Sequence, residues 1–93
     1  MRWIERRLLR INDEILRLRR EKELVAGELE MHRHLADDAE RDAAVYEGLE
    51  REEARMANKD VAALERTLER SQRNLDRAEA RRLELLRRLD AAR

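Results

Sequence analysis

Aliphatic residues recur along this chain at alternating intervals of four and three residues, and this spacing constrains the fold more than any other feature. One run extends from Ile4 to Tyr46 and a second from Ala54 to Ala92. Such a heptad pattern keeps one face of an α-helix against a partner helix. We therefore predict a self-association seam made of Ile4, Leu8, Ile11, Ile15, Leu18, Val25, Leu29, Val61, Leu64, Leu68, Leu75, Leu85 and Leu89.

The composition favours long helices over a globular fold. Charged residues make up 47% of the 93 residues, aromatic residues make up 2%, and there is no proline. Large apolar side chains are too scarce to fill a three-dimensional core, whereas Ala, Glu, Leu and Arg with helical periodicity are typical of coiled coils. The regular spacing of the aliphatic residues also argues against disorder of the whole chain. The predicted fold class is all-α.

The phase of the two runs favours a long antiparallel coiled-coil hairpin. The runs share one heptad column but differ in the other, so a single straight helix would have to change its contact face near the middle. Two antiparallel helices present mirror-image seams to each other and remove this conflict. When residues whose numbers sum to 93 are paired, Leu18 meets Leu75, and the polar interruption Lys22 meets the polar interruption Ser71.

We predict one coiled-coil domain over residues 1–93, with a first helix over about 3–46 and a second over about 49–92. The turn is expected near 46–49, at Tyr46-Glu47-Gly48, because Gly48 can adopt the left-handed conformation that ends a helix. One alternative is a nearly continuous long helix in a coiled-coil dimer. Others are breaks at 36–38 or 58–60, where Asp37 and Asn58 are suitable helix caps.

Apolar residues beside the seam predict further association. A face wider than a heptad seam indicates more than two helices, so we expect a homodimer that forms a four-helix bundle. The predicted dimer face consists of Leu9, Leu16, Leu83 and Leu86. A weaker side stripe, which completes the bundle or receives a partner helix, consists of Leu24, Met31, Leu35, Val45, Leu49 and Met56.

Charge is unevenly distributed although the formal net charge is zero. Residues 1–34 carry a balance of +2, residues 35–60 one of −5 and residues 61–93 one of +3. A possible basic surface contains Arg81, Arg82, Arg87 and Arg88, which could bind phosphate groups. Glutamates lie among these arginines and aromatic residues are nearly absent, so a solvated, salt-bridged face is the favoured interpretation.

The sequence predicts no catalytic residue and no cofactor. There is no cysteine, no glycine-rich phosphate loop, and the carboxylates alternate with arginines as helix-stabilising pairs one turn apart. His32 and His34 do not converge, because His32 lies on the seam and His34 lies off it. We therefore expect neither a metal site nor enzymatic activity.

These patterns predict a non-catalytic adaptor or scaffold that acts through self-association and binds an unidentified protein partner. The alternative is a regulatory binder of nucleic acid or an anionic membrane surface through its Arg-rich end. This alternative function is the weaker prediction, because most of the arginines are expected to form salt bridges with neighbouring glutamates. No apolar run approaches the roughly 20 residues of a membrane span, and the N-terminus does not resemble a signal peptide, so we expect a cytoplasmic protein.

Overall fold

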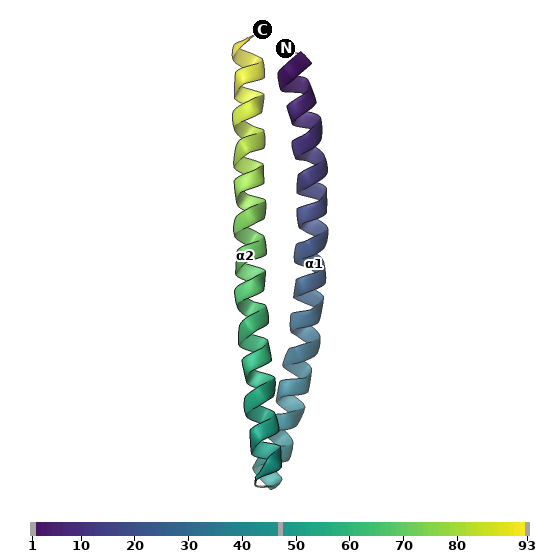
Figure 1. Cartoon of the computed structure of the whole chain (residues 1–93), viewed down its shortest axis with the longest axis vertical. Coiled ribbons are helices and arrows are strands. Elements are labelled where there is room, and N and C mark those ends of the chain that lie inside the picture. The colour runs from purple at the N-terminus through teal and green to yellow at the C-terminus, as the bar shows by residue number, and fades with distance from the viewer. Residues whose placement is uncertain (1, 47, 93) are drawn as a thin grey trace. The chain divides into compact units, whose positions relative to one another are not determined.

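A computed structural model describes residues 2–46 and 48–92 and shows a helical hairpin (Figure 1). Helix α1 spans Arg2–Val45 and contains 44 residues, and helix α2 spans Leu49–Ala91 and contains 43. No strand occurs in the described ranges. The predicted all-α hairpin is confirmed. The alternative of one continuous helix is wrong, because α1 ends at Val45 and α2 begins at Leu49. Breaks at 36–38 or 58–60 are also wrong, because α1 runs through the first range and α2 through the second.

Asn58 illustrates why a residue suited to capping does not interrupt a helix here. Its side-chain amide donates a hydrogen bond of 2.6 Å to Glu40 Oε1 on α1 and one of 3.0 Å to the backbone carbonyl of Ala54. The amide is therefore satisfied within α2 and between the helices. Both hydrogen bonds are donated by the amide nitrogen, whereas a helix cap would need the side-chain oxygen to accept from a backbone N–H, so Asn58 does not act as a cap here.

The turn is formed at the position expected from Gly48. This glycine has a φ of +86°, which lies in the left-handed region that residues with a Cβ atom rarely adopt. The backbone N–H of Tyr46 donates to the carbonyl of Asp42 at the end of α1, and the N–H of Glu52 donates to the carbonyl of Gly48 at the start of α2. Glu47, also assigned to the turn, lies outside the described residues.

The chain divides into two compact units, each containing part of both helices. The terminal unit comprises Met1–Lys22 and Arg70–Arg93, and the turn unit comprises Glu23–Glu69. In the terminal unit, buried aliphatic side chains from both helices form one cluster: Ile4, Ile11, Ile15, Leu18, Leu75, Ala78 and Leu85, with Leu8 and Leu89 packed against it. Burial of these large side chains is the main source of stability in this unit.

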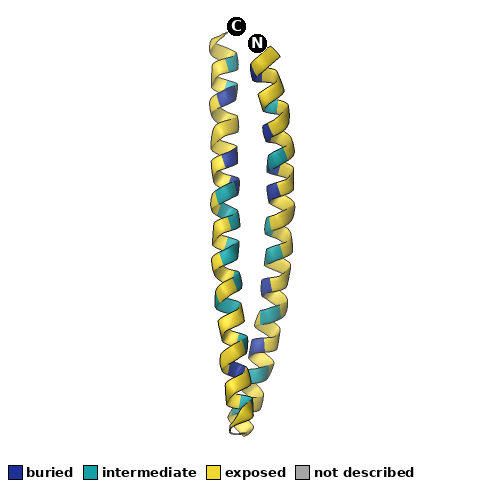
Figure 2. Ribbon diagram, viewed as in Figure 1, coloured by how far each residue is buried: buried dark blue, intermediate teal, exposed yellow. Residues whose placement is uncertain are grey.

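The turn unit has a much thinner interior. Its buried hydrophobic residues are Leu29, Ala36 and Ala54 (Figure 2). Alanine allows two helices to approach closely but removes little apolar surface from water. The helix pair in this unit is therefore held by less hydrophobic burial than the pair in the terminal unit.

Candidate interaction surfaces

The predicted seam is used within the chain, where it packs α1 against α2. All of its residues are buried or half-buried. Ile4, Ile11, Ile15, Leu18, Leu29, Leu75 and Leu85 are buried, and Leu8, Val25, Val61, Leu64, Leu68 and Leu89 are half-buried. Contacts with another molecule must therefore use side chains outside this seam.

Polar contacts join the two helices in the terminal unit. Arg82 Nε donates to Asn12 Oδ1 at 2.7 Å, and Arg81 Nη2 donates to Glu14 Oε1 at 3.1 Å. Arg19 Nη2 lies 3.6 Å from Glu79 Oε1. As the residue number rises along α1, that of the partner on α2 falls, which is the register of an antiparallel pair. Two of the four arginines predicted as a basic surface thus contribute to contacts within the hairpin.

The other two arginines of that prediction are also in the terminal unit. Arg88 Nε lies 3.4 Å from Glu84 Oε1, one turn earlier on α2. Arg87 is exposed. The four arginines therefore do not form one continuous free surface, because three of them have partners within the chain.

The predicted dimer face is largely exposed in the single chain. The exposed fractions of Leu9, Leu16 and Leu83 are 67%, 50% and 49%, and Leu86 is half-buried. All four residues belong to the terminal unit. Leucines left in water contribute no hydrophobic stabilisation, so this face is a candidate contact surface.

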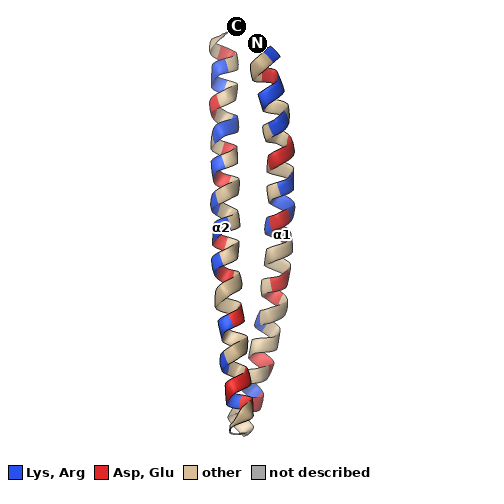
Figure 3. Ribbon diagram, viewed as in Figure 1, with Lys and Arg blue, Asp and Glu red and all other residues tan. Residues whose placement is uncertain are grey.

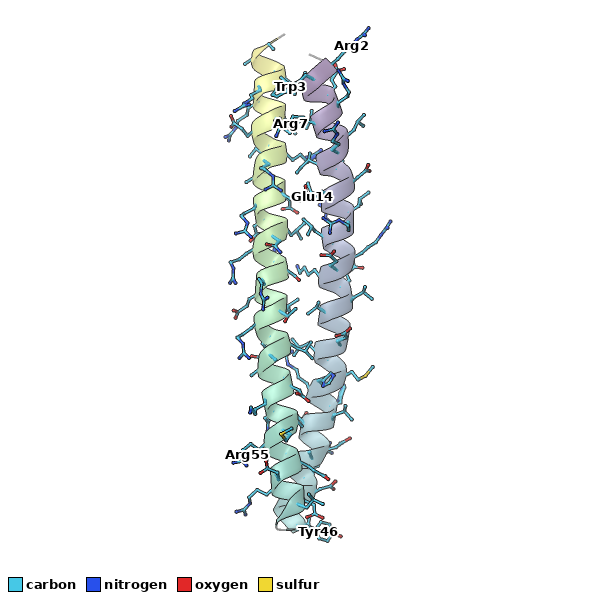
Figure 4. The ribbon with its side chains drawn as sticks, viewed as in Figure 1. Arg2, Trp3, Arg7, Glu14, Tyr46 and Arg55 are labelled. Carbon is cyan, nitrogen blue, oxygen red and sulfur yellow. The ribbon has the colours of Figure 1, made fainter. Side chains whose placement is uncertain are left out.

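A groove in the terminal unit combines basic side chains with an aromatic ring. It has a volume of about 670 Å³ and is lined by Trp3, Arg6, Arg7, Arg10, Ile11, Glu14, Arg81, Glu84, Leu85 and Arg88. We call it the basic groove. The guanidinium carbon of Arg7 lies 5.2 Å from the centre of the Trp3 ring, a cation–π contact. Figure 4 labels Trp3, Arg7 and Glu14 along α1.

The side stripe of the turn unit is exposed throughout. It consists of Leu24, Met31, Leu35, Val45, Leu49 and Met56, and Tyr46 is exposed as well. Elsewhere in this unit, Arg33 Nη2 lies 3.7 Å from Glu65 Oε1 and links α1 to α2. These apolar side chains are separated by carboxylates, and they make the turn unit a second candidate contact surface.

The two histidines differ in how far they are buried. His32 is half-buried in the seam, and His34 is exposed with its Nε2 atom 3.4 Å from Glu30 Oε1. Within residues 2–46 and 48–92, no three His, Cys, Asp or Glu side chains are placed to hold a metal ion. Neither histidine enters the candidate surfaces.

The part of the chain that the structure describes contains no helix long and apolar enough to cross a membrane. Comparisons with protein-family models, with curated proteins and with solved structures find no match for this chain.

The basic groove itself was not predicted from the sequence, although Arg81 and Arg88 of the predicted basic surface line it. Its lining comes from α1 and α2 together, so it exists only once the helices are paired in their final register. The one local signal was the spacing of Trp3 and Arg7, which places both side chains on one helix face.

Proposed function

We propose that this chain is a non-catalytic adaptor or scaffold that self-associates, as a homodimer, and binds another protein in the cytoplasm. The observation that carries the proposal is the exposure of Leu9, Leu16 and Leu83 on a hairpin whose seam is already filled. Apolar side chains beside a filled seam favour packing against further helices. A four-helix bundle of two hairpins is the simplest assembly that buries them.

The side stripe supports the adaptor role. An exposed row of Leu and Met side chains suits an amphipathic helix, from a second copy of the chain or from another protein, because flexible Met side chains adapt to different surfaces. We assign no catalytic residue, metal or cofactor in this proposal.

Light scattering on the eluting protein tests self-association. Replacing Leu9 and Leu16 together by Gln removes apolar surface without changing charge, so we expect the mass to fall to that of one chain while helicity is retained. The matched control replaces the exposed Ala80 and Ala91 by Gln and should keep the mass of the unchanged protein. A wild-type protein that is monomeric at all practical concentrations contradicts the proposal.

A second candidate function is binding of nucleic acid or an anionic membrane surface. The basic groove favours it, since Arg6, Arg10 and Arg88 lie there with the Trp3 ring. Retention on heparin or on anionic vesicles, lost in high salt and after substitution of these arginines by Gln, would support this function. Equal retention of the substituted and unchanged proteins would exclude the groove as the site.

A further inference from the structure

The fold sorts the charges of the chain into two units of opposite sign. Residues 1–22 and 70–93 carry 16 Arg and Lys against 8 Asp and Glu, a formal charge of +8. Residues 23–69 carry 6 Arg and Lys against 14 Asp and Glu, a formal charge of −8. The separation arises because folding brings the two basic ends of the chain into one unit (Figure 3).

Ion pairs within the chain do not remove this excess charge. The pairs Arg17–Glu21, Arg19–Glu79, Arg81–Glu14 and Arg88–Glu84 join residues of the terminal unit. Three further pairs join residues of the turn unit: Arg33–Glu65, Arg41–Asp38 and Arg55–Glu52. Each pair uses one acid and one base of the same unit, so the excess of each sign remains at that unit's surface.

The terminal unit has exposed apolar side chains as well as an excess of positive charge. In the basic groove, Arg6, Arg7, Arg10, Arg81 and Arg88 outnumber Glu14 and Glu84, and Trp3 is half-exposed beside them. Leu9, Leu16 and Leu83 are also exposed in this unit, although none of them lines the groove. A complementary surface would be both apolar and acidic.

The turn unit has those two properties. Leu24 and Met31 are exposed, and Glu28 lies one helical turn from each of them on α1. Around the exposed Met56 on α2, one turn away, lie Glu52, Glu53 and Asp60 together with Lys59. The apolar stripe of this unit is therefore set among carboxylates.

We propose that two copies of this chain associate through unlike units, so that the terminal unit of one copy packs against the turn unit of the other. This proposal rests on the self-association proposed above and specifies which surfaces meet. Contact between two terminal units would bring together two formal charges of +8, which repel each other. Contact between unlike units brings a formal charge of +8 against one of −8, which attract each other. Packed surfaces lie within the Debye length of about 8 Å at physiological salt, so these charges are incompletely screened.

Salt dependence gives the first test, because the two arrangements respond with opposite sign. If unlike units meet, raising the salt concentration screens an attraction and the dimer dissociates more readily in sedimentation equilibrium. If like units meet, salt screens a repulsion and the dimer becomes tighter, which overturns the proposal but leaves self-association intact. A chain that is monomeric at every salt concentration overturns both the pairing and the proposed function.

Charge-neutralising variants locate the positive surface. Replacing Arg6, Arg10 and Arg88 by Gln removes three charges from the basic groove and should weaken dimerisation by roughly tenfold. The control replaces Arg20, Arg70 and Arg73 by Gln, which are exposed, belong to the same unit and do not line the groove. Equal weakening by both variants overturns the groove as the contact surface.

Spin labels test the pairing directly, and the absence of cysteine makes single labelling specific. Ala80→Cys places a label in the terminal unit and Lys59→Cys places one in the turn unit, both at exposed positions. Pulsed dipolar spectroscopy should detect a short distance between chains only when the two labelled proteins are mixed. A short distance in protein labelled at Ala80→Cys alone shows contact between terminal units and overturns the proposal.

Discussion

The terminal unit and the turn unit are built on the same heptad spacing, yet they fill it with different side chains. The seam of the terminal unit is made mostly of Ile and Leu, which form one buried cluster across both helices. The buried residues of the turn unit are one leucine and two alanines. Helical pairing is thus set by spacing in both units, whereas the stability of the pairing depends on the size of the side chains placed at those positions.

The largest expected effect comes from removing a large side chain of the terminal cluster. Leu18 is 6% exposed, so Leu18→Ala should lower the free energy of unfolding by about 3 kcal/mol, through lost burial and the cavity left behind. Urea denaturation followed by circular dichroism measures the change. The exposed Leu24 is the control, and Leu24→Ala should cost less than about 0.5 kcal/mol when the protein is dilute enough to be monomeric. Equal losses of unfolding free energy in the two variants would contradict the burial of Leu18 in the terminal cluster.

Hydrogen exchange compares the two units without any substitution. Amides in the turn unit should open with a free energy about 2 kcal/mol lower than amides in the terminal unit, because fewer apolar contacts must be broken. Residues near the helix ends are left out of the comparison, since fraying lowers their protection in either unit. Uniform protection along both helices would show that the hairpin opens as one cooperative body.

Two glycine substitutions compare a position in the turn with a position inside a helix. Gly48→Ala should destabilise the hairpin by about 1 kcal/mol, because its φ of +86° is unfavourable for a residue with a Cβ atom. Gly27→Ala should stabilise it by about 0.5–1 kcal/mol, since Gly27 lies within α1. The pair is well matched because a Cβ atom added at either position meets nothing within 4 Å. Thermal denaturation should show a lower melting temperature for Gly48→Ala and a higher one for Gly27→Ala.

The smallest expected effects come from the ion pairs between the helices. Glu79→Gln in the terminal unit and Glu65→Gln in the turn unit should each cost less than about 0.5 kcal/mol, because both pairs are half-exposed and screened by salt. Their similar N···O distances of 3.6 and 3.7 Å make them comparable. A loss in only one unit would show that its surroundings strengthen the pair, and urea denaturation at low and high salt would detect it.

Much of the fold could be predicted because spacing alone determines it. The phase change between the two runs indicated an antiparallel pair, and Gly48 marked the turn. Asp37 and Asn58 were weaker guides, since a residue that can cap a helix can also form its side-chain hydrogen bonds inside a helical pair. Asn58 does so with Ala54 on its own helix and with Glu40 on the other.

The candidate surfaces were only partly predictable. Exposed apolar residues such as Leu9 and Leu83 follow from the seam, because they lie beside it. The sign of the charge separation also follows, because the ends carry +2 and +3, the middle carries −5, and the predicted hairpin joins the two ends. Its full size does not follow from these windows. Charges of +8 and −8 appear when the residues are grouped by their contacts in the folded chain, which joins the two ends.

The position of the large side chains also determines the order in which folding becomes favourable. Contacts in the turn unit join residues that are close in sequence, so forming them costs little chain entropy. The alanines at these contacts, however, bury little apolar surface and stabilise them weakly. Ile4 and Leu85 belong to one cluster although most of the chain lies between them. Burial in this cluster therefore stabilises the chain only after nearly all of it has been ordered. Weakening the turn unit should therefore slow folding, and weakening the terminal unit should mainly hasten unfolding.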